Sequence, residues 1–309
     1  MSQILVFSER GELLLEMLGK AQELVASGLS DSITAVGWDD ADDYARYGAD
    51  RVVSLAFPAE SQQMECATYA LADVVNNNEI TLVMIGATKR GKEIAARLSA
   101  KIDAPCVTDI SVLEYSDSSV SATHLIYGGK GISKDAFSKL PLVVTVSPRR
   151  YSKVENPKEA VIENAAPLPE SKIRVVGRKP NPKSDVDVSK AEAIVCVGRG
   201  LKSVEDLQMA QDLADVIGGV VACTRPISED FGWLPTDRYI GLSGQQAAPD
   251  LHISLGCSGQ IQHIAGVRNA KVIVAVDTDQ AAPIWDAADY GIVGDMYEIV
   301  PELIKKLKG

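Results

Sequence analysis

The chain has 309 residues, a length typical of two domains, and its 46% hydrophobic and 24% charged residues are ordinary for a globular protein. The formal net charge of −11 disfavours nucleic acid as a partner, because phosphate binding requires a basic surface. No apolar run approaches the roughly 20 residues that a membrane-spanning helix needs. The apolar run 4–7 lacks the basic segment and cleavage site of a signal peptide. We therefore expect no membrane insertion and a cytoplasmic location, or a matrix-like one if a targeting segment has been removed.

The five cysteines contain no CxxC pair and stand mostly in apolar, strand-like contexts, as Cys196 does. We therefore expect buried thiols in a reducing compartment. An iron–sulfur cluster needs clustered cysteines, which the sequence lacks. The three histidines, His124, His252 and His263, are too scattered along the chain for a zinc motif. The sequence alone thus predicts no metal site.

The first half of the chain alternates strand-like and helix-like segments, as α/β domains do. The run 81–85 is almost continuously apolar and ends at Gly86, which is typical of a buried parallel strand. Residues 106–127 and 141–147 are strand-like with no helix between them, so a mixed sheet is expected. The expected strands are 4–7, 32–37, 51–55 and 81–85, and the expected helices are 11–27, 41–47, 62–76 and 89–101.

Residues 152–189 interrupt this alternation with five prolines and many charges, and the stretch 178–183 is typical of a linker. We therefore expect an N-terminal domain over 1–180, with a linker at about 152–189, and a C-terminal domain over 190–309. The predicted fold class is α/β, with a nucleotide-binding-like N-terminal domain that has a mixed sheet and a Rossmann-like C-terminal domain that has a parallel sheet. In the second domain the expected strands are 193–197, 219–223, 251–255 and 272–276, the expected helices are 204–217, 260–267, 283–288 and 296–307, and a long loop is expected over 226–249.

Ligands of open α/β sheets bind where strands end and loops lead into helices. Four such ends in the second domain carry glycine or polar residues, at 198–203, 224–225, 256–263 and 277–279. Ser258 and Gly259 would present a hydroxyl and backbone N–H groups that suit a phosphate. Each turn taken singly is equally consistent with a plain strand-to-helix connection.

A turn in the first half resembles the start of a P-loop, because residues 86–92 read GATKRGK after a strand and before a helix. The next residue should be Ser or Thr to hold Mg²⁺, but it is Glu93, and a carboxylate there would repel a triphosphate. A nucleotide-dependent enzyme that uses this turn is therefore one alternative function.

Taken together, the C-terminal motifs resemble those of the electron transfer flavoprotein α family. The loop 256–263 reads GCSGQIQH and is similar to the family signature GxSGxIQH. The turn GRGLK at 198–202, the pair TR at 224–225, and the segments API at 282–284 and ADYGIVGD at 288–295 are similar to further family motifs. The resemblance is strong over 192–309. It is looser over the first domain, where 87–92 and 127–129 are similar to the branch associated with carnitine and related acyl-CoA reduction.

The resemblance implies an FAD-binding electron carrier, not a stand-alone catalyst, that forms an αβ heterodimer with a β subunit. It also implies redox partners of the acyl-CoA dehydrogenase or reductase type. By the same resemblance, Arg225 would stabilise negative charge on the reduced flavin, Ser243 would approach flavin N5, and His263 would lie at the C2 carbonyl. The cofactor-binding residues implied are Arg199, Thr224, Arg225, Gly241, Leu242, Ser243, Ser258, Gly259, Gln260, Ile261, Gln262, His263, Asp277, Asp295 and Met296.

Within this set, residues 258–262 would hold the ribityl and pyrophosphate part, and Arg199, Asp277 and Asp295 would hold the adenosine end. Three positions depart from the family pattern: Ser243 replaces a common Thr, Leu242 a common Gln, and Asp277 a common Asn. The last two departures support a second alternative, a cofactor-free interaction subunit.

Overall fold

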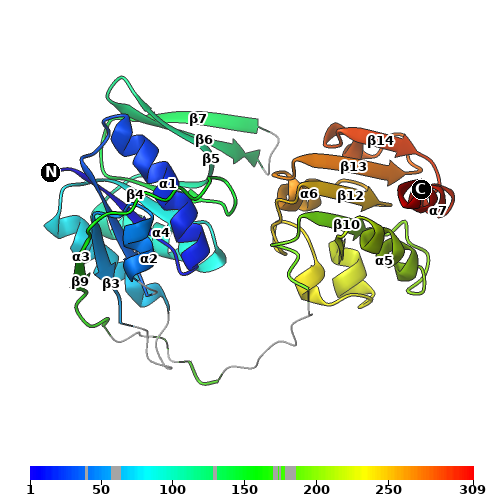
Figure 1. Cartoon of the computed structure of the whole chain (residues 1–309), viewed down its shortest axis with the longest axis horizontal. Coiled ribbons are helices and arrows are strands. Elements are labelled where there is room, and N and C mark those ends of the chain that lie inside the picture. The colour runs from blue at the N-terminus through cyan, green and yellow to red at the C-terminus, as the bar shows by residue number, and fades with distance from the viewer. Residues whose placement is uncertain (39–40, 57–63, 128–130, 170–172, 174, 178–185) are drawn as a thin grey trace. The chain divides into compact units, whose positions relative to one another are not determined.

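The computed structural model describes residues 1–38, 41–56, 64–127, 131–169, 173, 175–177 and 186–309. The chain divides into two compact units, Met1–Lys179 and Pro180–Gly309 (Figure 1). The linker expected at 178–183 and the glycines at 128 and 129 lie outside the described residues. Among the helices that are described, none is long and apolar enough to cross a bilayer.

The N-terminal unit is built on a nine-stranded mixed sheet with the order β7-β6-β5-β8-β4-β1-β2-β3-β9. Its centre is parallel, and the chain runs from β1 outward to β2 and β3 before it crosses to β4 on the other side of β1. The elements are β1 (Gln3–Phe7), α1 (Gly11–Ala26), β2 (Ser32–Gly37), α2 (Ala41–Arg46), β3 (Arg51–Ser54), α3 (Ala67–Asn77), β4 (Ile80–Gly86), α4 (Lys89–Ile102), β5 (Cys106–Ser116), β6 (Ser119–Ile126), β7 (Gly131–Phe137), β8 (Leu142–Val146) and β9 (Val161–Asn164).

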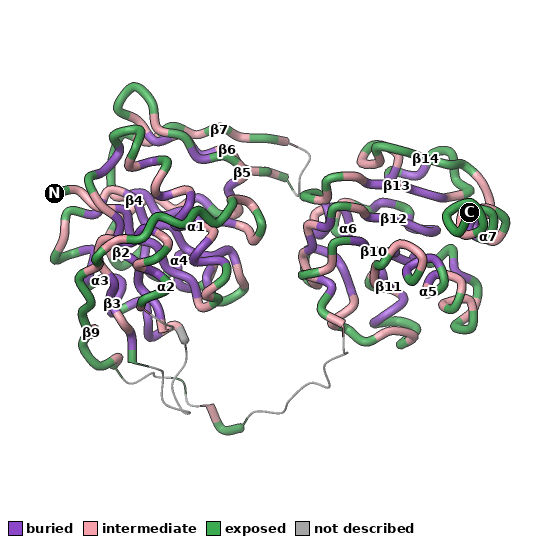
Figure 2. The backbone as a smooth tube through the Cα atoms, viewed as in Figure 1, coloured by how far each residue is buried: buried purple, intermediate pink, exposed green. Residues whose placement is uncertain are grey.

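Helices cover both faces of this sheet, which explains why its central strands are apolar throughout. In β1, Ile4 and Val6 pack into the core beneath α1 and α2, whereas Leu5 and Phe7 pack into the core beneath α3 and α4. All four side chains are fully buried, and Figure 2 shows that buried residues gather in the middle of the unit. The α/β class and the mixed sheet predicted from the sequence are confirmed.

The antiparallel part of the sheet consists of β5, β6 and β7. The hairpin between β5 and β6 turns at Asp117 and Ser118, whose φ angles of 49° and 59° match the left-handed turn that suits twisted strands. The sequence prediction covered β5 and β6 but did not include β7, whose side chains are all partly or fully exposed.

Part of the stretch that was expected to be linker belongs to this sheet. Strand β9 pairs in parallel with β3, and the N–H groups of Asn156 and Lys158 donate to the carbonyls of Arg46 and Ala45. The prolines and charges of this stretch therefore do not separate all of it from the N-terminal unit. The strand was missed because all four of its residues are exposed, so no apolar pattern marks it.

The C-terminal unit is a five-stranded, wholly parallel sheet with the order β11-β10-β12-β13-β14. This confirms the predicted parallel α/β unit, to which the structure adds β14 as an exposed edge strand. The long loop expected after β11 begins with a π-helical turn, Pro226–Asp230. The elements are β10 (Ala193–Val197), α5 (Leu207–Val216), β11 (Val220–Cys223), β12 (Leu251–Leu255), α6 (Ile261–Val267), β13 (Val272–Asp277), a 3-10 turn (Pro283–Asp286), β14 (Tyr290–Val293) and α7 (Met296–Lys308).

Candidate functional site

The C-terminal sheet changes direction at β10, since the chain continues to β11 on one side and returns to β12 on the other. The loops after β10 and β12 therefore leave the same edge of the sheet side by side, where α/β folds bind ligands. They are joined by backbone hydrogen bonds, from Gly198 N to Leu255 O (2.9 Å) and from Gly200 N to Gly256 O (3.0 Å).

Glycine is required at three positions where these loops meet. A Cβ on Gly198 would lie 2.3 Å from the carbonyl oxygen of Gly256, and one on Gly200 would lie 2.7 Å from the Gly256 Cα. Gly256 itself has a φ of +61°, which side-chain-bearing residues rarely adopt. The glycines of both sequence motifs thus serve one purpose, which is to let two loops approach each other within backbone contact.

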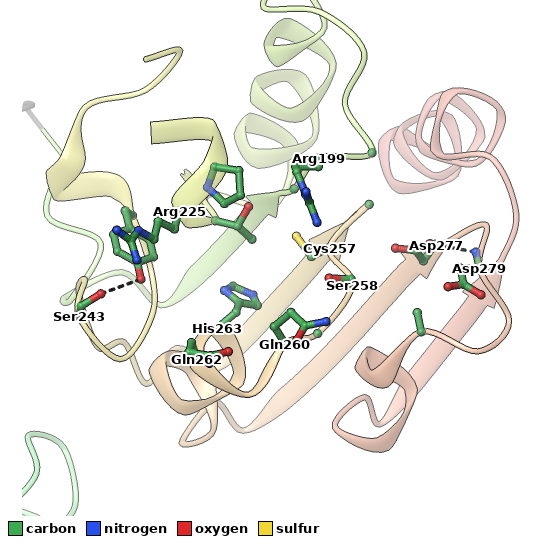
Figure 3. A pocket seen from close by; sticks show the side chains of 18 residues that line it. Arg199, Arg225, Ser243, Cys257, Ser258, Gln260, Gln262, His263, Asp277 and Asp279 are labelled. Carbon is green, nitrogen blue, oxygen red and sulfur yellow. Dashed lines mark hydrogen bonds between the residues drawn. The ribbon is translucent and has the colours of Figure 1, made fainter. Parts of the chain in front are cut away.

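A cavity of about 460 Å³ opens beside this contact, within the range of small-molecule sites. In Figure 3, Arg225 and Ser243 lie at one end, Asp277 and Asp279 at the other, and Cys257, Ser258 and His263 between them. The predicted site residues that line it are Arg199, Thr224, Arg225, Ser243, Ser258, Gly259, Gln260, Gln262, His263 and Asp277.

Arg225 supplies a cation at the end of β11, directly before the π-helical turn. Its Nε donates to the Glu229 carboxylate at 2.6 Å, and this bond raises the pKa of the guanidinium further. The side chain is largely exposed in the cavity mouth, so the ion pair orients Arg225 more than it stabilises the fold.

Ser243 is positioned by a tight loop. Its hydroxyl lies 3.1 Å from the hydroxyl of Tyr239, and a Cβ on Gly241 would come within 2.7 Å of that same tyrosine oxygen. Gly241 therefore contributes space for the Tyr239 ring rather than a contact of its own in the cavity.

His263 is the buried polar group of the site, in the first turn of α6. Its Nδ1 lies 3.2 Å from the carbonyl oxygen of Ile240, and because a carbonyl can only accept, the proton is on Nδ1. Burial lowers the pKa of His263. The ring is therefore neutral near pH 7, and its Nε2 carries a lone pair.

The opposite end of the cavity is acidic. The Asp277 carboxylate accepts from Asp279 N at 2.9 Å, and the Asp279 carboxylate accepts from Ala281 N at 2.9 Å. These bonds fix both carboxylates as hydrogen-bond acceptors, which suit hydroxyl groups of a ligand and oppose phosphate groups.

Five predicted site residues do not line the cavity: Gly241, Leu242, Ile261, Asp295 and Met296. Asp295 caps α7 by accepting from Tyr297 N at 2.9 Å. Met296 is buried, and its Cε packs where a Cβ on Gly200 or Gly256 would be. Leu242 is exposed, and only its backbone reaches the site, through a bond from its N–H to Gln262 O at 2.7 Å.

The structure adds cavity residues that were not among the predicted cofactor-binding residues: Gly198, Gly200, Pro226, Tyr239, Gly256, Cys257, Asp279 and Ala282. The glycines stood inside the motifs already singled out, so their part in the loop contact could have been inferred. Nothing in the sequence marks Tyr239, which reaches the cavity from the long loop between β11 and β12.

The P-loop-like turn of the N-terminal unit is filled by its own side chains. The Thr88 hydroxyl accepts from Gly91 N at 2.9 Å and donates to the Glu9 carboxylate, which enters from the end of β1. Lys92 is paired with Asp109 at 2.7 Å. A negative charge thus stands where a phosphate would bind, and the lysine already has a partner.

Comparison with known proteins gives two family matches that together span most of the chain. Residues 4–170 match the electron transfer flavoprotein domain, and residues 187–268 match the electron transfer flavoprotein FAD-binding domain. The chain is 35% identical to the "Putative electron transfer flavoprotein subunit YdiR" of Escherichia coli K12, over 99% of this chain and 98% of the relative. It is 32% identical to Protein FixB of Escherichia coli O157:H7 and of Shigella flexneri, again over 99% of this chain and 98% of each relative.

Proposed function

This chain belongs to the electron transfer flavoprotein family, as a protein of its α type, and on that premise we propose that it carries electrons on an FAD held in the C-terminal cavity. The single observation that carries the proposal is the convergence of the family's scattered motifs on one cavity. Segments at 198–200, 224–226, 256–263 and 277–279 all line it, although they are far apart in the sequence.

The residues present suit this cofactor. The glycine contact between the loops after β10 and β12 leaves backbone groups, not side chains, at the edge of the cavity, which allows close approach of a bulky ligand. A cation stands at one end, and fixed carboxylate acceptors stand at the other. We expect the isoalloxazine ring near Arg225, Ser243 and His263, and the ribose hydroxyls near Asp277.

FAD supplies the one- and two-electron chemistry, and the protein supplies binding and electrostatics. The positive charge of Arg225 favours negative charge on a ligand beside it. His263 holds its proton at Nδ1, so it can donate from Nε2 only after it takes up a second proton. Burial lowers the pKa of His263 and so opposes that uptake, and a negative group beside the ring would favour it. Arg225 and His263 would therefore both respond to the charge of the reduced cofactor.

The proposal includes a β-type subunit as the permanent partner and redox enzymes of the acyl-CoA dehydrogenase or reductase type as electron donors or acceptors. Family membership supports a partner subunit and redox enzymes in general, and the finer assignments follow the sequence resemblance. The chain itself acts in this scheme as a carrier rather than as a catalyst of substrate turnover.

The test is to co-express the chain with the β-type subunit, purify the complex, and record its absorption spectrum during stepwise reduction. We expect flavin bands in a 1:1 ratio to the chain that bleach as electrons are added. A stable complex that stays colourless with excess FAD would refute the proposal and favour a cofactor-free interaction subunit.

Arg225→Ala sharpens this test. We expect the variant to bind FAD with a lower reduction potential, because the reduced cofactor loses its cation, whereas Arg225→Lys keeps most of the potential. An unchanged potential in Arg225→Ala would show that this side chain does not act on the flavin.

A further inference from the structure

Three metal-ligand groups come together beside the middle of the cavity. The thiols of Cys196 and Cys257 and a ring nitrogen of His263 all lie within 4.8 Å of one another, and all three residues are buried. Cys196 comes from β10, Cys257 from the loop after β12, and His263 from α6, so only the fold brings them together.

His263 has the orientation of a metal ligand. Its Nδ1–H donates to the Ile240 carbonyl, and its Nε2 lies 4.0 Å from the Cys196 sulfur. Histidine ligands commonly donate their other N–H to a backbone carbonyl in this way, which fixes the ring and the tautomer. The Nε2 lone pair therefore accepts from the Cys196 thiol, and a metal ion that replaced that thiol proton would need no rearrangement of the ring.

We propose that the flavin-free chain binds one thiophilic divalent cation of the Zn²⁺ class on Cys196, Cys257 and His263. Zn–S and Zn–N distances of about 2.3 and 2.0–2.1 Å put tetrahedral ligands roughly 3.5–3.8 Å apart, so the present groups need to move by about 1 Å or less. Each thiol gives its proton to the solvent as its sulfur binds.

Charge and ligand type select this class of ion. Two thiolates balance the charge of one divalent cation, so the assembled site is neutral and can lie next to the apolar cluster that contains Cys196 and Cys257. Mg²⁺ and Ca²⁺ prefer oxygen ligands, which this set does not provide. The scattered sequence positions predicted no metal site, because proximity here is created by the strand order.

His252 is a candidate for the fourth position. It is fully buried, and neither of its ring nitrogens has a hydrogen-bond partner among the described residues. Its ring centroid lies 5.8 Å from that of His263, whereas two imidazoles on one tetrahedral ion lie roughly 5 Å apart. Coordination would give this imidazole a partner that the metal-free protein lacks.

Cys257 and His263 also line the cavity that we assign to FAD, so the ion and the flavin would exclude each other. This competition rests on the proposed function, whereas the metal site does not. If both hold, the ion blocks flavin loading and keeps the chain from becoming a carrier.

The experiment titrates Cd²⁺ into the full chain freed of flavin and follows thiolate-to-metal absorption, with bound metal counted by mass spectrometry. We expect one ion per chain. Cys196→Ser or Cys257→Ser should weaken binding by more than the roughly 10–100-fold that the loss of an outer partner costs. Cys66→Ser is the control, because Cys66 is a buried cysteine of the N-terminal unit, and this variant should bind like the wild type.

X-ray absorption of the wild-type Zn²⁺ complex counts two sulfur ligands without any variant, so poor folding of a variant cannot hide the answer. The proposal would be overturned if the wild type showed no thiolate-to-metal absorption, or if Cys196→Ser and Cys257→Ser both bound Cd²⁺ as tightly as the wild type. Excess FAD should displace the ion. A chain that binds Cd²⁺ but never FAD would refute the carrier function and leave the metal site standing.

Discussion

The two units of the chain share a plan but differ at the place where that plan allows a ligand. Each has a parallel sheet whose first strand lies between the second strand and a later one, and each has a glycine turn at that position. In the N-terminal unit, Glu9 and Thr88 occupy the turn, and Asp109 neutralises Lys92. In the C-terminal unit, the corresponding loops enclose a cavity of about 460 Å³.

A glycine turn after a strand is therefore necessary for a ligand cavity at the edge of the sheet but does not by itself create one. The turn at 86–92 has the closer match to a nucleotide-binding motif, yet the Glu9 carboxylate from the end of β1 fills it. The turn at 198–203 has the poorer match, yet glycine on both sides of the contact keeps the space beside it open. Whether a cavity forms depends on which side chains at the ends of the neighbouring strands lie in the turn.

The largest expected effect comes from closing the C-terminal turn with a side chain. Gly198→Val places a Cβ 2.3 Å from Gly256 O, which should destabilise the C-terminal unit by about 3 kcal/mol and abolish FAD binding. Gly177→Val is the matched control, because a Cβ added to Gly177 meets no atom of the described residues within 4 Å. Chemical unfolding and flavin content measure the two effects. Normal FAD binding by Gly198→Val would show that the loop contact does not shape the site.

The second-largest effect expected is that acid destabilises the C-terminal unit. Burial lowers the pKa of His252 from 6.5 to about 3. Between these two pH values the imidazole is protonated in the unfolded C-terminal unit and neutral in the folded one. The free energy of unfolding of the C-terminal unit is therefore highest above pH 6.5 and decreases as the pH falls toward 3. At pH 5 the decrease is about 2 kcal/mol. Hydrogen exchange at pH 7 and pH 5 should show weakening of the C-terminal unit.

Two histidine variants test the origin of that effect. His252→Phe should remove most of the difference between pH 7 and pH 5, whereas His124→Phe, in the N-terminal unit, should leave the C-terminal response intact. The same acid response in His252→Phe as in the wild type would assign the effect to other groups.

A smaller effect is expected in the N-terminal turn. Thr88→Ala removes the side-chain cap of α4 and should cost about 1 kcal/mol of that unit's stability, with no change in flavin content. Thr108→Ala, at an exposed position of β5, is the control and should cost less. Gain of nucleotide binding or loss of flavin in Thr88→Ala would contradict the division of roles between the units.

The smallest expected effect concerns the exposed partner of Arg225. Glu229→Gln keeps an acceptor for the Arg225 Nε but removes a negative charge, so the flavin potential should rise slightly. Asp230→Asn makes the same charge change one residue further on and should shift the potential less. A fall in potential after Glu229→Gln would mean that the carboxylate acts by placing Arg225 rather than by its charge.

Most of the fold could be predicted because central strands carry their own signal. β1, β4 and β10 are apolar on both faces at their buried positions, since helices cover both, and β12 is equally buried although His252 and Ser254 lie on one of its faces. The three strands that were not predicted, β7, β9 and β14, are all sheet edges with largely exposed side chains. An edge strand forms by pairing with a neighbouring strand, and its exposed side chains leave no apolar pattern in the sequence from which that pairing could be predicted.

The candidate site divides in the same way. The loop 256–263 and Arg225 could be found from motifs, because ligand contact and loop geometry restrict those residues locally. Tyr239 could not be found, because its position in the cavity depends on how the long loop between β11 and β12 folds, whereas Asp279 lay within the strand end 277–279 that the sequence had already indicated. Leu242 and Met296 lie beside motif residues but support the site from outside it, a distinction that sequence proximity does not make.

The most direct test of the central claim is a crystal structure of the chain with its β-type subunit, grown in the presence of FAD. We expect one flavin in the C-terminal cavity of this chain, with its ring system beside Arg225, Ser243 and His263, and no ligand at the turn 86–92. Flavin bound at the N-terminal turn, or a C-terminal cavity that remains without flavin at saturating FAD, would contradict it.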